Sequence, residues 1–215
     1  MRVRLFFISI IIIFYGCNRN SQKFDLIAKR DSIGVLIQQG QITNDTLMLK
    51  KALSYCDYLI EADENHNNHF LYYKNKSIIF SVLGEKEKAW LEMEKSMQLL
   101  DENNIDRLKF YCVKYLRLQN KDSADYYFKK AFTVCENRLS TGWNENDVLS
   151  KTELLLYQGK RHEAKAYLKE ESKKRPDNEV LKTALETWDE WSKTDHPFIG
   201  ICNPDVNNGG YAIRK

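Results

Sequence analysis

The strongest constraint on how this chain can fold is an internal repeat. Ala89, Ala124 and Ala164 occupy equivalent positions in three stretches that align without gaps, and they are 35 and 40 residues apart. A turn position lies five residues before each alanine, and it is filled by Gly84 in the first stretch and by Gly159 in the third. This recurrence predicts stacked units, because a single helical hairpin cannot bury its apolar stripe alone.

The three stretches resemble tetratricopeptide repeats, a family built from helix–turn–helix units of about 34 residues. The alanines match the small residue at which the second helix of a unit packs closely on the first, and Pro176 matches the proline that closes a unit. Tyr73 supplies the large aromatic residue that the family places early in the first helix, whereas Leu108 and Val148 stand there in the other two units. The resemblance covers residues 45–192.

Further helices are predicted on both sides of these units. A weaker fourth unit precedes them, with a first helix over residues 23–39 that ends at Gly40 and a second helix that is capped by Asp45. The longer spacing before the third unit indicates an insertion, which we expect to form a loop over residues 137–146. A last helix over residues 180–191 is expected to close the stack.

The composition agrees with a helical protein. Only 9 Gly and 3 Pro occur among 215 residues, too few for the turns of a β-sandwich, and the 43% hydrophobic content argues against disorder. The expected fold class is therefore all-α, a tetratricopeptide-repeat-like (TPR-like) α-solenoid of three to four helical hairpins. This repeat domain covers residues 23–192, and an irregular C-terminal tail follows at residues 193–215.

The N-terminal segment is predicted to be an export signal. Arg2 and Arg4 precede an apolar run over residues 5–15, which is shorter than the roughly 20 residues needed to span a bilayer. The pair Gly16 and Cys17 that follows resembles a bacterial lipobox, in which the chain is cut before the cysteine and the thiol is lipidated. The resemblance implies a lipoprotein signal peptide at residues 1–16 and a palmitate-bearing Cys17, with an uncleaved membrane anchor as the alternative.

The residues after Cys17 indicate where the protein would be held. Residues 18–22 are polar, so residues 17–22 are interpreted as a tether, and no acidic run follows the cysteine. We therefore expect a lipid-anchored protein that faces the periplasm from either the outer or the inner membrane. The formal net charge is +3 and falls to +1 without Arg2 and Arg4, so no strong field for nucleic acid is expected.

No motif of an enzyme, cofactor or metal site is found. The sequence contains no HExxH, GxSxG, GxGxxG or P-loop pattern. His66 and His69 are three residues apart near several carboxylates, but they are interpreted as solvated loop residues. We therefore expect a non-enzymatic protein without a cofactor.

The cysteines lack the spacing of a redox or zinc motif, because no CxxC occurs. Cys56 and Cys112 fall at core positions of the repeat pattern and are expected to be buried free thiols. The sequence leaves open whether Cys135 or Cys202 takes part in a disulfide.

The repeat resemblance also implies a ligand groove, because certain positions of each first helix line the concave face in that family. Carried over unit by unit, these positions are Lys74, Ile78, Ser81, Lys109, Val113, Arg117, Glu153, Leu156 and Tyr157. Their mixture of cationic heads and apolar surface implies a peptide segment or an acidic terminus as the ligand. The function expected from the resemblance is that of a protein–protein interaction scaffold in the bacterial cell envelope.

Three alternatives come from other functional classes. A glycan-binding envelope lipoprotein would need an aromatic platform, for which the sequence offers Trp143 in the expected loop. A regulatory or sensor repeat protein would act on another chain. An enzyme would need a titratable pair on the concave side, where Glu153 is the one acidic residue that the pattern places.

Overall fold

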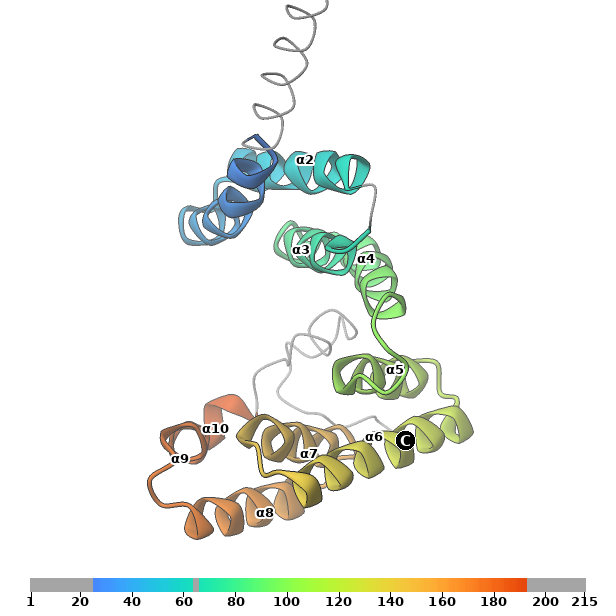
Figure 1. The fold of residues 1–215 in the computed structure, drawn as a ribbon, viewed down its shortest axis with the longest axis vertical. Helices are drawn as coiled ribbons and strands as arrows, with labels where there is room; N and C mark the ends of the chain where they lie inside the picture. Colours follow the sequence, from blue (N-terminus) through green and yellow to red (C-terminus); the bar gives the residue numbers. More distant parts are fainter. Residues whose placement is uncertain (1–24, 64–65, 193–215) are drawn as a thin grey trace, which may run out of the picture. The chain divides into compact units, whose positions relative to one another are not determined.

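The computed structural model describes residues 25–63 and 66–192, and every regular element within these ranges is an α-helix (Figure 1). The expected signal peptide at residues 1–16, Cys17 with the rest of the tether, Cys202 and the tail at residues 193–215 lie outside the described residues. Among the helices that are described, none combines the length and apolar character needed to cross a bilayer.

The chain divides into two compact units after Ser96. The first unit contains a helix over residues 25–43, α2 (Thr46–Ala62), α3 (His69–Val82) and most of α4 (Lys86–Gln98). The second unit contains α5 (Ile105–Arg117), α6 (Lys121–Thr141), α7 (Glu145–Tyr157), α8 (Arg161–Lys174), α9 (Glu179–Glu186) and α10 (Trp188–Trp191).

The core of the first unit is formed where three helices bring their apolar stripes together. Residues three, four or seven apart share one face of a helix, so each helix offers a single stripe to its neighbours. The buried side chains come from the helix over residues 25–43, from α2 and from α3, and they are Ile33, Ile37, Leu49, Ala52, Cys56, Leu59, Tyr72 and Ile79. A hydrogen bond of 2.6 Å from Ser96 Oγ to the carbonyl oxygen of Phe70 joins α4 to α3.

The expected end of the first helix at Gly40 is wrong, because the helix continues to residue 43. A Cβ atom at Gly40 would lie 2.8 Å from Leu49 Cγ, so the glycine permits the close approach of α2 instead of ending the helix. The predicted cap is confirmed, since Asp45 Oδ1 accepts a hydrogen bond of 2.8 Å from the Leu47 N–H.

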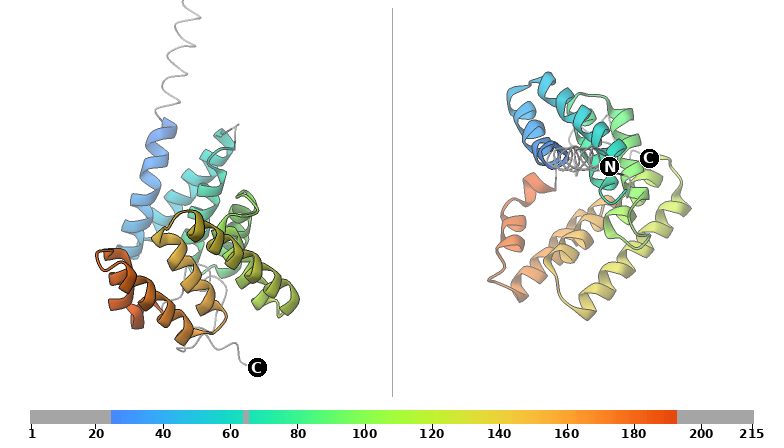
Figure 2. Two further views of the ribbon diagram at one scale, coloured as in Figure 1. Left: turned by 60° about the horizontal axis from the view of Figure 1, so that its bottom comes forward. Right: turned by 45° about the horizontal axis from the view of Figure 1, so that its top comes forward.

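In the second unit, each helix packs against the next one along the chain. The helices α5 to α9 form four such neighbouring pairs, and α5 also contacts α7, as α7 contacts α9 (Figures 1 and 2). The helices α5, α7 and α9 therefore lie side by side in this order. The predicted helical hairpins, α5 with α6 and α7 with α8, are present, and Ala124 and Ala164 are buried in them as expected.

The insertion expected to form a loop at residues 137–146 is mostly helical. Helix α6 continues to Thr141, and only residues 142–144 connect it to α7. The connecting Trp143 is half-buried, because the Arg175 guanidinium lies 4.0 Å from the centre of its ring. Its Nε1 donates to Glu171 Oε2 at 3.4 Å, so this tryptophan braces α7 against α8.

The C-terminal helix that was expected over residues 180–191 is broken. Helix α9 ends at Glu186, and α10 begins after Thr187. Leu181 and Trp188 still point into the unit as the pattern predicts. They belong to a core that also contains Val148, Leu156, Ala164 and Leu168.

Three cysteines are buried free thiols, as expected for Cys56 and Cys112 and now also found for Cys135. Burial raises the pKa of Cys56 to about 12 and that of Cys135 to about 11, and it raises the pKa of Cys112 as well. Because the thiolate is the reactive form, these side chains are inert at neutral pH.

The interpretation of His69 as a solvated loop residue is wrong. His69 begins α3 and is only 7% exposed, because the start of this helix packs into the first unit. His66 is exposed, as expected.

The turns explain how one unit of the repeat forms without its glycine. Gly84 and Gly159 have φ angles of 77° and 76°, and Gln119, which stands at the equivalent position, has a φ of 54°. This left-handed region costs a residue with a Cβ atom about 1–2 kcal/mol, whereas glycine adopts it freely. Gln119 is exposed, so contacts of its side chain do little to offset this conformational cost.

We predict that Gln119→Gly raises the free energy of unfolding by about 1 kcal/mol, because it removes this backbone strain. The reciprocal variant Gly159→Gln should lower it by a similar amount, since no atom lies within 4 Å of a Cβ at that position and only the backbone changes. Chemical denaturation followed by circular dichroism measures both. A destabilised Gln119→Gly variant would contradict the prediction.

Candidate functional site

The expected groove residues are divided between the two units. Lys74, Ile78 and Ser81 lie on α3 in the first unit, whereas the other six lie on α5 and α7 in the second. Because α5 contacts α7, the structure brings these six positions together on neighbouring helices. The site is therefore described on the second unit.

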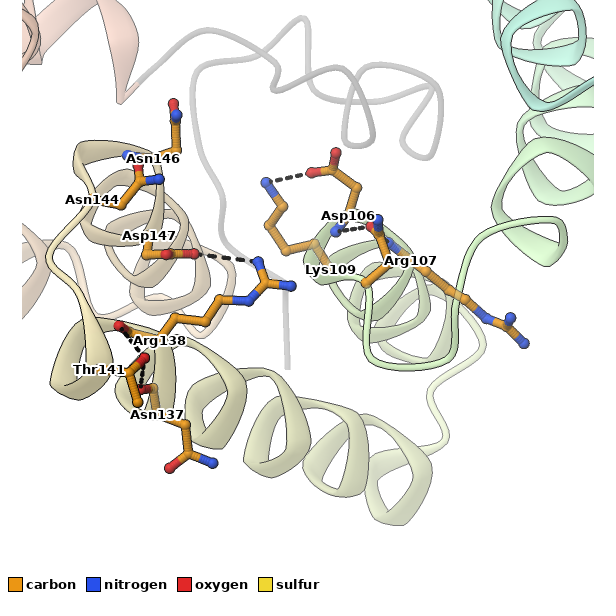
Figure 3. Close-up of polar contacts among 10 residues, drawn as sticks. Asp106, Arg107, Lys109, Asn137, Arg138, Thr141, Asn144, Asn146 and Asp147 are labelled. Carbon is orange, nitrogen blue, oxygen red and sulfur yellow. Dashed lines mark hydrogen bonds and ion pairs between the residues drawn. The ribbon is translucent and has the colours of Figure 1, made fainter. Parts of the chain in front are cut away.

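Lys109 is the centre of this site. Its Nζ lies 2.8 Å from Glu153 Oε2 on α7. It also lies 3.0 Å from Asp106 Oδ1, one turn earlier on α5 (Figure 3). The Lys109 side chain is 9% exposed, and that of Glu153 is 17% exposed. The ammonium group thus joins α5 to α7 through a largely buried ion pair.

The charges of this cluster stabilise each other. Burial by itself would lower the pKa of Lys109, but the nearby carboxylates of Glu153 and Asp106 outweigh it, so the pKa is raised. Lys109 therefore stays protonated at every physiological pH. The sequence pattern did not identify Asp106, although its position three residues before Lys109 on one helix is a recognisable signal for such a pair.

Two further ion pairs connect α6 to α7 near this cluster. Arg138 Nη1 lies 3.4 Å from Asp147 Oδ1 (Figure 3), and Lys151 Nζ lies 2.9 Å from Glu136 Oε1. Asp147 is buried, whereas Glu136 is exposed. These two ion pairs fix the position of α7 relative to α6. Neither was predicted from the sequence, because the two partners of each pair lie on different helices.

The remaining positions of α5 differ in their exposure. Val113 lies one turn after Lys109 and is buried, and Arg117 lies one turn further and is exposed. Of the three expected groove positions on α5, Arg117 is therefore the exposed one.

Four of the expected groove residues, the buried Val113 among them, contribute their side chains to the interior instead. Leu156 lies two turns after Val148 on the same face of α7 and belongs with it to the core of the second unit. Tyr157 is also buried, at 6% exposure. In the first unit, Ile78 packs against the core, and Lys74 and Ser81 are half-buried.

This arrangement favours recognition of a charged group. A ligand carboxylate that approaches Lys109 meets an ammonium already paired with Glu153, so it would compete with Glu153 for this group. Within the described residues, no group of three or more His, Cys, Asp or Glu side chains is placed to hold a metal ion.

Comparison with protein-family models, with curated proteins and with solved structures gives no match. What this face does must therefore be inferred from its own chemistry.

We predict that Lys109→Met lowers the free energy of unfolding by about 3 kcal/mol, because it removes the largely buried cation that Glu153 and Asp106 share. Combining it with Glu153→Leu should restore much of this loss, since the largely buried Glu153 charge is removed together with its cation and only the half-exposed Asp106 loses a partner. Urea denaturation of the two single variants and the double variant gives the coupling energy.

The pair Lys151 and Glu136 is the control for this measurement, because it also joins two helices but is more exposed. Its coupling energy should not exceed about 1 kcal/mol. An equally small coupling between Lys109 and Glu153 would show that their ion pair does not stabilise the contact of α5 with α7.

Proposed function

We propose that this protein is a lipid-anchored interaction protein of the bacterial cell envelope, which binds a peptide or protein surface without catalysing a reaction. The observation that carries the proposal is the side-by-side arrangement of α5 and α7, which brings Lys109 and Glu153 together, with Arg117 two turns later on α5. A protein of this kind acts by offering a shaped and charged surface to its partner.

The packing order of the helices supports a TPR-like array. Each helix of the second unit contacts its successor, and α5, α7 and α9 contact one another in sequence. This is the order expected when first helices form one layer and second helices form another. In such an array the layer of first helices lines the concave face, so α5 and α7 would present the ligand surface.

The proposed ligand carries a carboxylate, either at a peptide C-terminus or on an acidic side chain. Arg117 is exposed and can form a two-pronged contact with a carboxylate. A ligand carboxylate can also bind Lys109 if it partly replaces Glu153 as the partner of the ammonium. This competition favours ligands that place their carboxylate close to Lys109 Nζ. The half-buried Trp143 is covered by Arg175 and lends no support to the glycan-binding alternative.

The proposed location depends on the sequence signal at Cys17. A periplasmic position is supported by the absence of an acidic run after that residue. Several acyl chains on one cysteine hold a protein stably on a membrane, whereas a single chain binds weakly and reversibly.

The groove is tested with the variant Lys109→Gln/Arg117→Gln/Glu153→Gln, which removes the charges without leaving a buried charge unpaired. The matched control is Lys121→Gln/Asp125→Asn/Lys129→Gln, which makes the same change in net charge on an exposed face of α6. Both variants and the unmodified protein are cross-linked in native membranes, and the captured molecules are identified by mass spectrometry.

The unmodified protein and the control should capture the same protein partner, and recovery by the groove variant should be at least tenfold lower. This expectation follows from the loss of charge-assisted hydrogen bonds, each worth about 1.5–3 kcal/mol. Equal recovery by a groove variant with an unchanged circular dichroism spectrum would exclude this surface. Recovery of a polysaccharide in place of a protein would favour the glycan-binding alternative.

The lipid anchor is tested separately by growing cells with radioactive palmitate. The unmodified protein should incorporate label and stay with the membrane fraction, Cys17→Ser should lose the label, and Cys202→Ser should keep it. Label retained in Cys17→Ser, or absent from the unmodified protein, would show that Cys17 is not the lipidated residue.

A further inference from the structure

The outer face of the helix over residues 25–43 exposes large apolar side chains. This helix, drawn in blue in Figure 2, buries Ile33 and Ile37 in the core that it shares with α2 and α3. On its outer face, Ile27, Val35 and Ile42 are 40%, 52% and 75% exposed. Their spacings of eight and seven residues place them on one stripe of a helix with 3.6 residues per turn. The outer helix of an array normally presents polar residues, so this stripe indicates a contact with another molecule.

We propose that this outer face binds the same face of a second copy of the protein, with the two helices antiparallel about a twofold axis between Gly34 and Val35. Ile27 then lies beside Ile42 of the second copy, and Gly34 lies beside Val35. No atom lies within 4 Å of a Cβ built at Gly34, so the glycine leaves space on the surface for the valine of the second copy. A twofold axis forms each of these contacts twice.

The polar residues of the face are complementary in the same register. Asp31 lies beside Gln38 of the second copy, and Arg30 lies beside Gln39, all four being exposed in the single chain. A side-chain amide donates hydrogen bonds to a carboxylate through its nitrogen and accepts them from a guanidinium through its oxygen. Each charge can therefore gain a hydrogen-bond partner across the contact, while Arg30 Nε stays within 3.2 Å of Asp31 Oδ1 in its own chain.

Like charges disfavour the neighbouring arrangements. Parallel helices would place Asp31 against Asp31 of the second copy. An antiparallel register shifted by two turns in one direction brings the same two carboxylates together, and the opposite shift brings Asp31 against Asp45. Because like charges across an interface suppress association, the register centred between residues 34 and 35 is favoured over these three.

The contact is expected to form a weak dimer. One helix of each copy takes part, so the buried area stays below about 1,200 Å², which is typical of transient complexes. The twofold axis relates the N-terminal ends of the two helices, so both copies can be attached to one membrane when this axis is parallel to the membrane normal. The contact itself does not depend on the proposed lipid anchor.

The register is tested by cysteine cross-linking of the full chain in intact cells. Two differently tagged copies are expressed together, one with Ile27→Cys and the other with Ile42→Cys, and are treated with a short, membrane-permeable bismaleimide. Both copies carry Cys202→Ser, and this parent without an added cysteine is the background control. Cells in which both copies carry Ile27→Cys give the matched comparison, because the register places these two positions roughly 22 Å apart along the helix axis.

The mixed pair should form the cross-linked dimer at least tenfold more than the two Ile27→Cys copies or the parent. Adding Val35→Glu to both copies should lower this yield at least tenfold, because it would bury a carboxylate without a partner. Leu91→Glu, which adds the same charge at a 56% exposed position on α4, should leave the yield unchanged.

Immunoblots and circular dichroism show whether the variants are equally abundant and folded. Absence of a cross-link in the mixed pair, equal cross-linking of the two Ile27→Cys copies, or a yield that Val35→Glu does not lower would each overturn the proposal. Equal losses in Val35→Glu and Leu91→Glu would overturn it as well, since the effect would then not belong to this face.

Discussion

The fold depends on each helix having its apolar stripe covered by helices near it in the chain. A helix of about 13 residues is marginal on its own, so it persists only when a neighbour excludes water from its apolar face. Ala124 and Ala164 are completely or almost completely buried because they let the helices of a pair approach closely. Leu168, Leu181 and Trp188 then close the end of the second unit as one core.

This packing also explains why a charged group is found inside the contact of two helices. Lys109 would be costly to bury alone, and it is stable there because Glu153 and Asp106 approach it from two directions. Such a pair adds selectivity more than binding strength, since a ligand must replace an existing partner in order to reach the ammonium.

Much of the helical pattern could be predicted from local sequence, because helix caps, turns and apolar stripes involve residues close in the chain. The cap at Asp45 and the turn at Gly159 are examples. Residues 137–146 were assigned to a loop because they contain polar residues and a glycine, yet α6 continues to Thr141 and α7 already begins at Glu145. Leu156 was assigned to the ligand face by analogy of position, but the core of α7, α8 and α9 takes up its side chain.

The amino-acid sequence by itself determines the helices, their approximate ends and the all-α fold class, because these features follow from interactions between residues close together in the chain. The ion pair of Lys109 with Glu153 spans 44 positions and forms only when α5 and α7 lie side by side. The contact of His66 with His69 likewise requires the particular backbone turn between α2 and α3, although the two residues are close in sequence. Tertiary structure therefore decided which polar groups meet, since packing sets the distances between side chains that no local pattern relates.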